Sequence, residues 1–173
     1  MKLNLGCGLD KRREYLNCDK SKLVNPDRVI DLEKKLPFKN DSVDEILANH
    51  VLEHIVNFIP LMYELIRICK SGAIIKVKTP FYSAWGQFND PTHVRFFSPK
   101  TFDYFNKGTY SHQVDSDKDL LKVKKVKINF AIGRAKVLNS IFNPLINLHQ
   151  DFYCRFFAWI LPASEIEYEL IVK

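Results

Sequence analysis

The sequence lacks the features that mark metal-binding, secreted and membrane-spanning proteins. Its four cysteines form no CxxC pair, and no Cys/His spacing is typical of a zinc site, so we expect no metal centre. No segment reaches the roughly 18–20 uninterrupted apolar residues that a spanning helix needs. Met1 leads directly into a strand-like segment, so we expect no signal peptide. Reduced thiols in a cytoplasmic protein are the simplest interpretation.

The composition is that of a globular domain with a hydrophobic core. Of the 173 residues, 46% are hydrophobic and 27% are charged, which suits one domain better than two. The net charge of +6 permits attraction to phosphate, nucleic acid or an anionic membrane but identifies none of them. Since the lysines are spread along the chain, we interpret them mainly as a solvated basic surface.

Short apolar runs alternate with turns in the first eighty residues. We predict strands at 2–5, 15–18, 28–30, 43–48 and 73–78. Between the last two, apolar residues recur with helical spacing from Phe58 to Cys69, with Asn57 as the predicted N-cap. Strands that alternate with a helix in this way are typical of a mainly parallel sheet with both faces covered.

The second half of the chain has a different pattern. A helix is predicted at 99–105, and alternating residues at 125–132 and 166–172 predict an antiparallel pair of strands. Between them lies an aromatic-rich segment, 133–163, in which several apolar residues share a helical face: Phe152, Phe156, Trp159 and Ile160. We therefore predict a single α/β domain over 1–173, a Rossmann-like three-layer sandwich with a C-terminal antiparallel pair and a helical insertion at 133–163.

Glycines and polar residues follow four of the predicted strands directly. They are Gly6 and Gly8, Asp19, Asp31, and the pair Asn49 and His50. Ligands of parallel α/β sheets bind at the carboxyl ends of the strands, so these residues predict a binding site at one rim. A carboxylate after the second strand can accept both hydroxyls of a ribose, which is the role we expect for Asp19. Asp31 either reaches an adenine edge or caps a turn.

Two segments resemble a known family. NLGCG, followed by Asp19 and the string DLEKKLPFKNDSVDEILANHVLEHI, resembles class I S-adenosylmethionine-dependent methyltransferases of the type-11 domain group. The resemblance covers residues 2–80 well and the segment DPTHVRFFSPKTF more loosely. It implies S-adenosylmethionine as cofactor and these contacts with it: Leu5, Gly6, Cys7, Gly8, Asp19, Asp31, Leu32, Asn49 and His50.

Candidate catalytic residues are histidines near the predicted rim. A methyl group on a sulfonium is already activated, so a base is needed only when the acceptor is protonated. His50 lies at the rim, and His93 belongs to DPTHVRFF, which we expect to reach over the pocket. Loop anchoring is an equally good interpretation for the segment around His93.

The sequence departs from the family pattern in ways that bear on the cofactor. Asn4 stands where the family usually has an acid, and only about ten residues separate the first two strands, fewer than a parallel crossover normally needs. The first helix must then be truncated, which argues against NAD, because its pyrophosphate requires a helix N-terminus.

We therefore expect a methyltransferase whose acceptor is a small molecule or a glycan or lipid intermediate. A non-catalytic cofactor-binding or scaffold protein and an RNA-directed methyltransferase are the alternatives. There is no firm nucleic-acid signal, and Asn49-His50-Val51-Leu52 stands where base amino-methylases have [ND]PP[YFW]. Segment 133–163 is expected to form a lid, a homodimer contact or a peripheral membrane contact.

Overall fold

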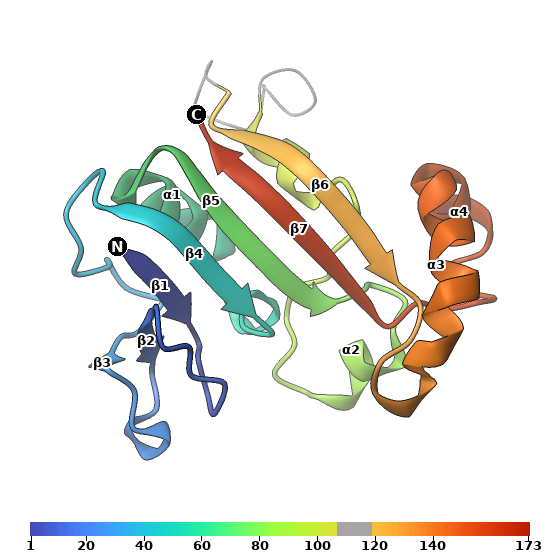
Figure 1. Cartoon of the computed structure of the whole chain (residues 1–173), viewed down its shortest axis with the longest axis horizontal. Coiled ribbons are helices and arrows are strands. Elements are labelled where there is room, and N and C mark those ends of the chain that lie inside the picture. Colours follow the sequence, from blue (N-terminus) through green and yellow to red (C-terminus); the bar gives the residue numbers. More distant parts are fainter. Residues whose placement is uncertain (107–118) are drawn as a thin grey trace.

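A computed structural model describes residues 1–106 and 119–173. These residues contain one seven-stranded sheet (Figure 1). The strand order is β3-β2-β1-β4-β5-β7-β6. The strands are β1 (Lys2–Leu5), β2 (Leu16–Asp19), β3 (Arg28–Val29), β4 (Val43–Asn49), β5 (Cys69–Pro80), β6 (Leu121–Asn129) and β7 (Glu165–Val172). Strands β1 to β5 pair in parallel, and β7 pairs antiparallel with both β5 and β6. The predicted Rossmann-like fold, with its C-terminal antiparallel strands, is confirmed.

The helices are short. They are α1 (Phe58–Ile68), α2 (Trp85–Asn89), α3 (Asn139–Leu148) and α4 (Gln150–Phe156), with 3₁₀ turns at Lys22–Val24, Leu52–His54, Thr101–Phe105 and Gly133–Leu138. Helix α1 forms where the apolar spacing predicts it and lies behind β4 and β5 in Figure 1. No helix within the described ranges is long and apolar enough to cross a membrane.

The core lies between the sheet and α1. Helix α1 buries its periodic apolar face, and the turn at Thr101–Phe105 adds two fully buried rings, Phe102 and Phe105. Tyr168 of β7 packs edge-on against Phe102 and donates its hydroxyl to the carbonyl of Ser98 at 2.6 Å. Much of the aromatic content of the chain is therefore core.

The connections that leave β1 and β2 are loops. Residues 6–15 contain turns, and residues 20–27 contain only the turn at Lys22–Val24, so the predicted truncation of the first helix is confirmed. Right-handed crossovers that move across a sheet in opposite directions cover opposite faces. Helix α1, in the connection from β4 to β5, covers one face of the sheet. The connections after β1 and β2 would cover the opposite face, but neither of them contains an α-helix.

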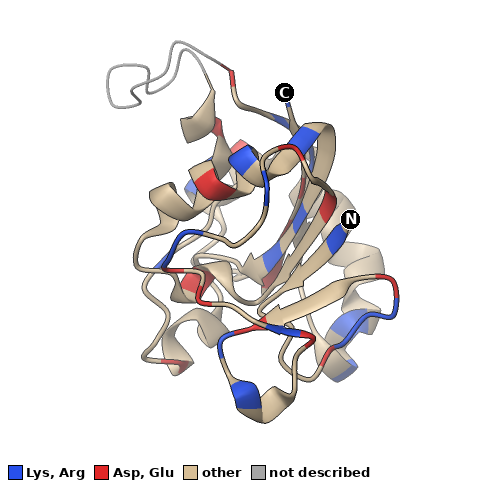
Figure 2. Cartoon of the chain, turned by 90° about the vertical axis from the view of Figure 1, so that its left-hand side faces the viewer, with Lys and Arg blue, Asp and Glu red and all other residues tan. Residues whose placement is uncertain are grey.

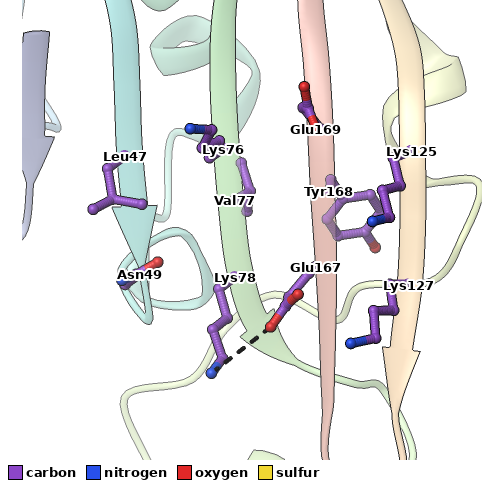
Figure 3. Close-up of a pocket in the computed structure, with 10 residues that line it drawn as sticks. All are labelled: Leu47, Asn49, Lys76, Val77, Lys78, Lys125, Lys127, Glu167, Tyr168 and Glu169. Carbon is purple, nitrogen blue, oxygen red and sulfur yellow. Dashed lines mark ion pairs between the residues drawn. The ribbon is translucent and has the colours of Figure 1, made fainter. Parts of the chain in front are cut away.

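That face carries an open groove of charged side chains over β4, β5, β7 and β6 (Figure 3). Lys78 pairs with Glu165 at 2.7 Å and lies 4.0 Å from Glu167, and Lys76 pairs with Glu45 at 2.6 Å. Figure 2 likewise shows Lys and Arg interspersed with Asp and Glu on the side it presents. Paired charges of both signs do not form the basic stripe that nucleic-acid binding favours.

Helix α3 turns a polar face toward the sheet. Three asparagines at i, i+4 and i+8 donate to or accept from the backbone beside β6: Asn139, Asn143 and Asn147. Asn147 alone accepts the Ile128 N–H and donates to the Ile128 carbonyl, both at 2.8 Å. These amides satisfy the backbone groups that an edge strand otherwise exposes. The apolar residues of α3 consequently point mostly away from the sheet.

Candidate active site

A cleft of about 310 Å³ opens at the carboxyl ends of the parallel strands. Its lining comes from the segments that follow β1, β2 and β4 and from the segment around β3: Gly6, Cys18, Asp19, Lys20, Ile30, Asp31, Leu32, Glu33, His50, Val51, His54 and Ile55. The volume is at the lower end of the range for small-molecule sites. The rim predicted from the sequence therefore contains a cavity.

Asp19 is held in place by backbone amides. Its Oδ2 accepts the Gly8 N–H, and its Oδ1 accepts the Ser21 N–H, each at 2.8 Å. Each carboxylate oxygen can accept a further hydrogen bond, so the carboxylate keeps capacity for two hydroxyls while its orientation is fixed. Asn4 lies behind this site, where its amide donates to Asp10 and Asn17 across the short loop.

The far wall of the cleft combines apolar side chains with a second carboxylate. Ile30, Leu32 and Ile55 are buried and offer a flat apolar surface. Asp31 accepts the Glu33 N–H at 3.1 Å in a turn, and one of its oxygens lies 3.7 Å from the Lys34 ammonium. Apolar walls with a few placed polar groups are typical of sites that bind a nucleoside.

Glu33 connects this wall to α1. Its carboxylate accepts the N–H groups of Val56 at 2.7 Å and Asn57 at 3.0 Å, immediately before the helix begins. Asn57 is the N-cap residue, as predicted, but its side chain makes no capping hydrogen bond. Glu33 instead fixes the backbone that leads into the helix and places a negative charge near its N-terminus.

His50 is a cation held between two carboxylates. Its backbone is left-handed, with φ of 49°, and its Nε2 donates to Glu165 at 2.9 Å while Nδ1 lies 3.3 Å from Glu53. The hydrogen bond that His50 donates to Glu165 and the nearby Glu53 carboxylate raise the pKa of His50 to about 9. An imidazole with that pKa is protonated at neutral pH and has no lone pair with which to accept a proton.

A second group of side chains lies beside His50. Glu53 is fully buried, and His54 and His93 contact each other with ring centroids 4.7 Å apart. The segment that carries His93 folds back on this group because the N–H groups of Val94 and Arg95 both donate to the Glu53 carbonyl, at 2.8 and 3.1 Å. Arg95 is a loop anchor, since its guanidinium donates to the carbonyls of residues 55 and 56.

The cleft brings together five of the residues expected to contact the cofactor, namely Gly6, Asp19, Asp31, Leu32 and His50. The other four lie elsewhere. Leu5 and Cys7 are buried, and Gly8 touches the cleft only through its hydrogen bond to Asp19. Asn49 lines the charged groove on the open face, beside Lys78, as Figure 3 shows.

Several residues that line the cleft were not assigned to the cofactor site from the sequence: Cys18, Lys20, Ile30, Glu33, Val51, His54 and Ile55. Most are direct neighbours of predicted residues, so widening each strand-end motif by one position would have found five of them. Cys18 is not a reactive thiol, because burial raises its pKa to about 12.

Comparison with known proteins agrees with this geometry. Residues 3–77 match the family model described as a methyltransferase domain. No curated protein matches the chain in sequence. The match ends at residue 77, near the end of β5, so it covers the cleft and leaves the second half of the chain unassigned.

Solved structures resemble the whole chain in fold. A SAM-dependent methyltransferase from Archaeoglobus fulgidus aligns with TM-score 0.60 and 14% identity, over 99% of this chain and 85% of that one. A putative sarcosine dimethylglycine methyltransferase from Galdieria sulphuraria aligns with TM-score 0.64 and 10% identity, over 99% and 76%. The [4+2]-cyclase SpnF aligns with TM-score 0.61 and 13% identity, over 98% and 74%.

These structural alignments show the fold, and the family match shows a methyltransferase domain over residues 3–77. The cyclase among the neighbours is a reminder that the fold alone does not fix the reaction. Residues 3–77 match a methyltransferase domain, the whole chain has the class I fold of S-adenosylmethionine-dependent methyltransferases, and S-adenosylmethionine is the cofactor that these two findings imply.

Proposed function

We propose that this protein transfers the methyl group of S-adenosylmethionine to an acceptor bound beside the cleft, a reaction of class EC 2.1.1. The observation that carries the proposal is the Asp19 carboxylate, which is fixed by two backbone N–H groups at the end of β2 with an apolar wall opposite. This pairing suits the ribose and adenine of the cofactor.

The described residues fit the cofactor. Asp19 would accept the ribose hydroxyls, Ile30 and Leu32 would flank the adenine with Asp31 at its edge, and Gly6 would leave space for the methionine end. When bound, S-adenosylmethionine supplies a methyl group already activated on a sulfonium. The protein then has to orient the acceptor and exclude water.

The acceptor would meet the histidines at the other end of the cleft. His50 is protonated at neutral pH, so we assign it to fixing Glu53 and Glu165 and to shaping the turn after β4. His93 is the better candidate for accepting a proton. Its Nδ1 lies 3.1 Å from the Gln87 carbonyl, which can only accept, so in a neutral ring Nε2 carries the lone pair.

We also propose that the acceptor is an amphiphilic molecule, such as a lipid-linked intermediate, reached at a membrane surface. Tyr82, which follows β5, contacts Trp159 with ring centroids 5.6 Å apart, so the aromatic insertion adjoins the rim that holds the cleft. Trp159 and Ile160 are exposed there. Four free cysteines suit a reducing compartment, so we place the protein at the cytoplasmic side.

Calorimetric titration tests the proposal. S-adenosylmethionine and S-adenosylhomocysteine should bind the purified protein, and NADH should not. Asp19→Asn should weaken that binding by tenfold or more, because hydrogen bonds to a charged group contribute about 1.5–3 kcal/mol each. Asp10→Asn, at an exposed carboxylate paired with Arg12, is the matched control and should leave the affinity unchanged. Binding of NADH alone, or an unchanged affinity in Asp19→Asn, would contradict the proposal.

A further inference from the structure

The cluster of Glu53, His54 and His93 contains one unsatisfied polar atom. Oε1 of Glu53 is fully buried and receives no hydrogen bond, although Oε2 accepts the Thr79 hydroxyl at 3.1 Å. His50 Nδ1 lies 3.3 Å from Oε1, but the geometry is not that of a hydrogen bond. The protonated His50 therefore balances part of the charge of Glu53, but Oε1 accepts no hydrogen bond and keeps lone pairs for a further positive partner.

Hydrogen bonds fix the tautomers of both histidines. The Thr92 hydroxyl donates to Asp90 at 2.6 Å, so its oxygen accepts from His54 Nδ1 at 2.8 Å. His93 Nδ1 donates to the Gln87 carbonyl at 3.1 Å. In both neutral rings the remaining lone pair is therefore on Nε2. An imidazole that donates one N–H to an outer partner and keeps the other nitrogen free is the usual state of a metal ligand.

One candidate ligand atom from each of the three residues lies within 4.8 Å of the others. Metal–ligand bonds to nitrogen and oxygen are about 2.0–2.2 Å, so small side-chain rotations close the remaining gap. Two imidazoles and one carboxylate make a donor set that suits zinc and similar transition metals and that does not favour magnesium.

We propose that Glu53, His54 and His93 bind a divalent transition-metal ion of the zinc type. With three protein ligands the ion keeps an open coordination position, as catalytic sites do. His54 lines the cleft, so the ion lies in its wall. Resting on the proposed function, its role is to bind and polarise an oxygen or nitrogen of the methyl acceptor. His93 then serves as a ligand of the ion in place of a proton acceptor.

The sequence did not indicate this site because its ligands come from two segments about forty residues apart. Glu53 and His54 are adjacent, and His93 joins them only because its loop pairs with the Glu53 carbonyl. Conventional zinc spacings keep ligands in local pairs.

Metal titration of the chelator-treated full chain tests the site without any cofactor. Zn²⁺ should bind with one equivalent by calorimetry, and Co²⁺ should give a visible absorption spectrum. His54→Ala and His93→Ala should each weaken binding at least tenfold. His149→Ala removes an exposed histidine outside the cluster and should leave binding unchanged. Thr92→Val, which removes the hydroxyl that accepts from His54 and donates to Asp90 and leaves all three ligands in place, should weaken binding about tenfold.

The outcomes separate the two proposals. Absence of one-equivalent binding, or equal affinity in the wild type, His54→Ala and His93→Ala, would overturn the metal site. If circular dichroism shows that the alanine variants are unfolded, Thr92→Val is the test variant in their place. A Zn²⁺ affinity of Thr92→Val equal to that of the wild type would then overturn the proposed metal site. S-adenosylhomocysteine binding to the metal-free protein is measured separately, so a cofactor failure with intact Zn²⁺ binding counts against the proposed function alone.

Discussion

Gly6, in the first turn after β1, lies against Val51 with no room for a side chain. Its φ is +59°, and a Cβ added there would come within 2.4 Å of Val51 Cγ2. The left-handed backbone costs an alanine roughly 1–2 kcal/mol, and the overlap adds about 1–3 kcal/mol. Gly6→Ala should therefore lower the free energy of unfolding by about 2–5 kcal/mol in urea denaturation.

Two variants separate these contributions. Gly8 has a φ of +49° but open space around its Cβ position, so Gly8→Ala should show only the backbone cost. Adding Val51→Ala to Gly6→Ala should recover part of the loss, because it removes the overlapping atoms. Equal destabilisation by the two glycine variants would show that the contact with Val51 does not limit this turn.

Glu64 gives the chain a pH-dependent contribution to stability. It accepts two 2.7 Å hydrogen bonds from Arg67 and one of 2.9 Å from the Leu36 N–H. The Arg67 hydrogen bonds, with that from Leu36, lower the pKa of Glu64 from 4.5 to about 2. Because the folded pKa lies below the unfolded one, this stabilisation is present above pH 4.5 and is lost as the pH falls toward 2.

Glu64→Gln should remove about 2–3 kcal/mol of unfolding free energy at neutral pH and much less near pH 3. Urea denaturation of both proteins at the two pH values measures the difference. Glu14→Gln is the control, since Glu14 is an exposed carboxylate that pairs with Lys2 at 3.4 Å. A constant difference between wild type and Glu64→Gln across this range would contradict the assignment.

At the scale of elements, the sequence predicted what depends on local periodicity. Helix α1 and all seven strands form near the predicted positions, because alternation and 3.6-residue spacing report burial directly. The N-cap position of Asn57 was also predicted, but the contact of Glu33 with the backbone before α1 was not, since Glu33 comes from a loop more than twenty residues away. Asn49 was placed in the cleft by its position after β4, but the side chain points to the open face.

The insertion at 133–163 also shows that local periodicity does not predict contacts between distant segments. Its helical character was predicted from Phe152, Phe156, Trp159 and Ile160. The sequence did not predict which face of its helices would pack against the sheet. Hydrophobic periodicity normally marks the buried face. Helix α3 reverses this rule because the exposed edge of β6 offers backbone groups, and asparagine amides satisfy them better than apolar side chains do.

The reversed orientation of α3 predicts an unusual pair of mutational effects. Asn147→Leu should destabilise the fold by about 1–3 kcal/mol, because the N–H and carbonyl of Ile128 lose their partner. Leu145→Asn, on the exposed face of the same helix, should change the free energy of unfolding by less than about 0.5 kcal/mol. Denaturation of both variants measures this contrast, and the opposite order would show that the apolar face is the packed one.

At the scale of the whole molecule, the insertion lies at the edge of the sheet beyond β6 (Figure 1). Many of its apolar side chains are exposed. This apolar surface comprises exposed residues of α3, α4 and the turn that follows: Ile141, Leu145, Leu148, Phe152, Phe156, Phe157, Trp159 and Ile160. Segment 133–163 also contains Arg134, Lys136 and Arg155, and its one acidic residue, Asp151, is paired with Lys100. Apolar and aromatic groups beside basic ones are typical of helices that lie on anionic membranes.

We therefore expect the protein to sediment with vesicles containing anionic phosphatidylglycerol and much less with neutral phosphatidylcholine vesicles, with binding weakened by salt. The double variant Ile141→Ser/Leu148→Ser should reduce binding at least tenfold, since burying each apolar side chain contributes about 1.5 kcal/mol or more. Leu23→Ser removes an equally exposed leucine near the other end of the sheet and should have no effect. If vesicles do not bind, and sedimentation instead reveals a dimer that the double variant abolishes, the surface is a contact between two copies of this chain, and delivery of the acceptor from a membrane is wrong.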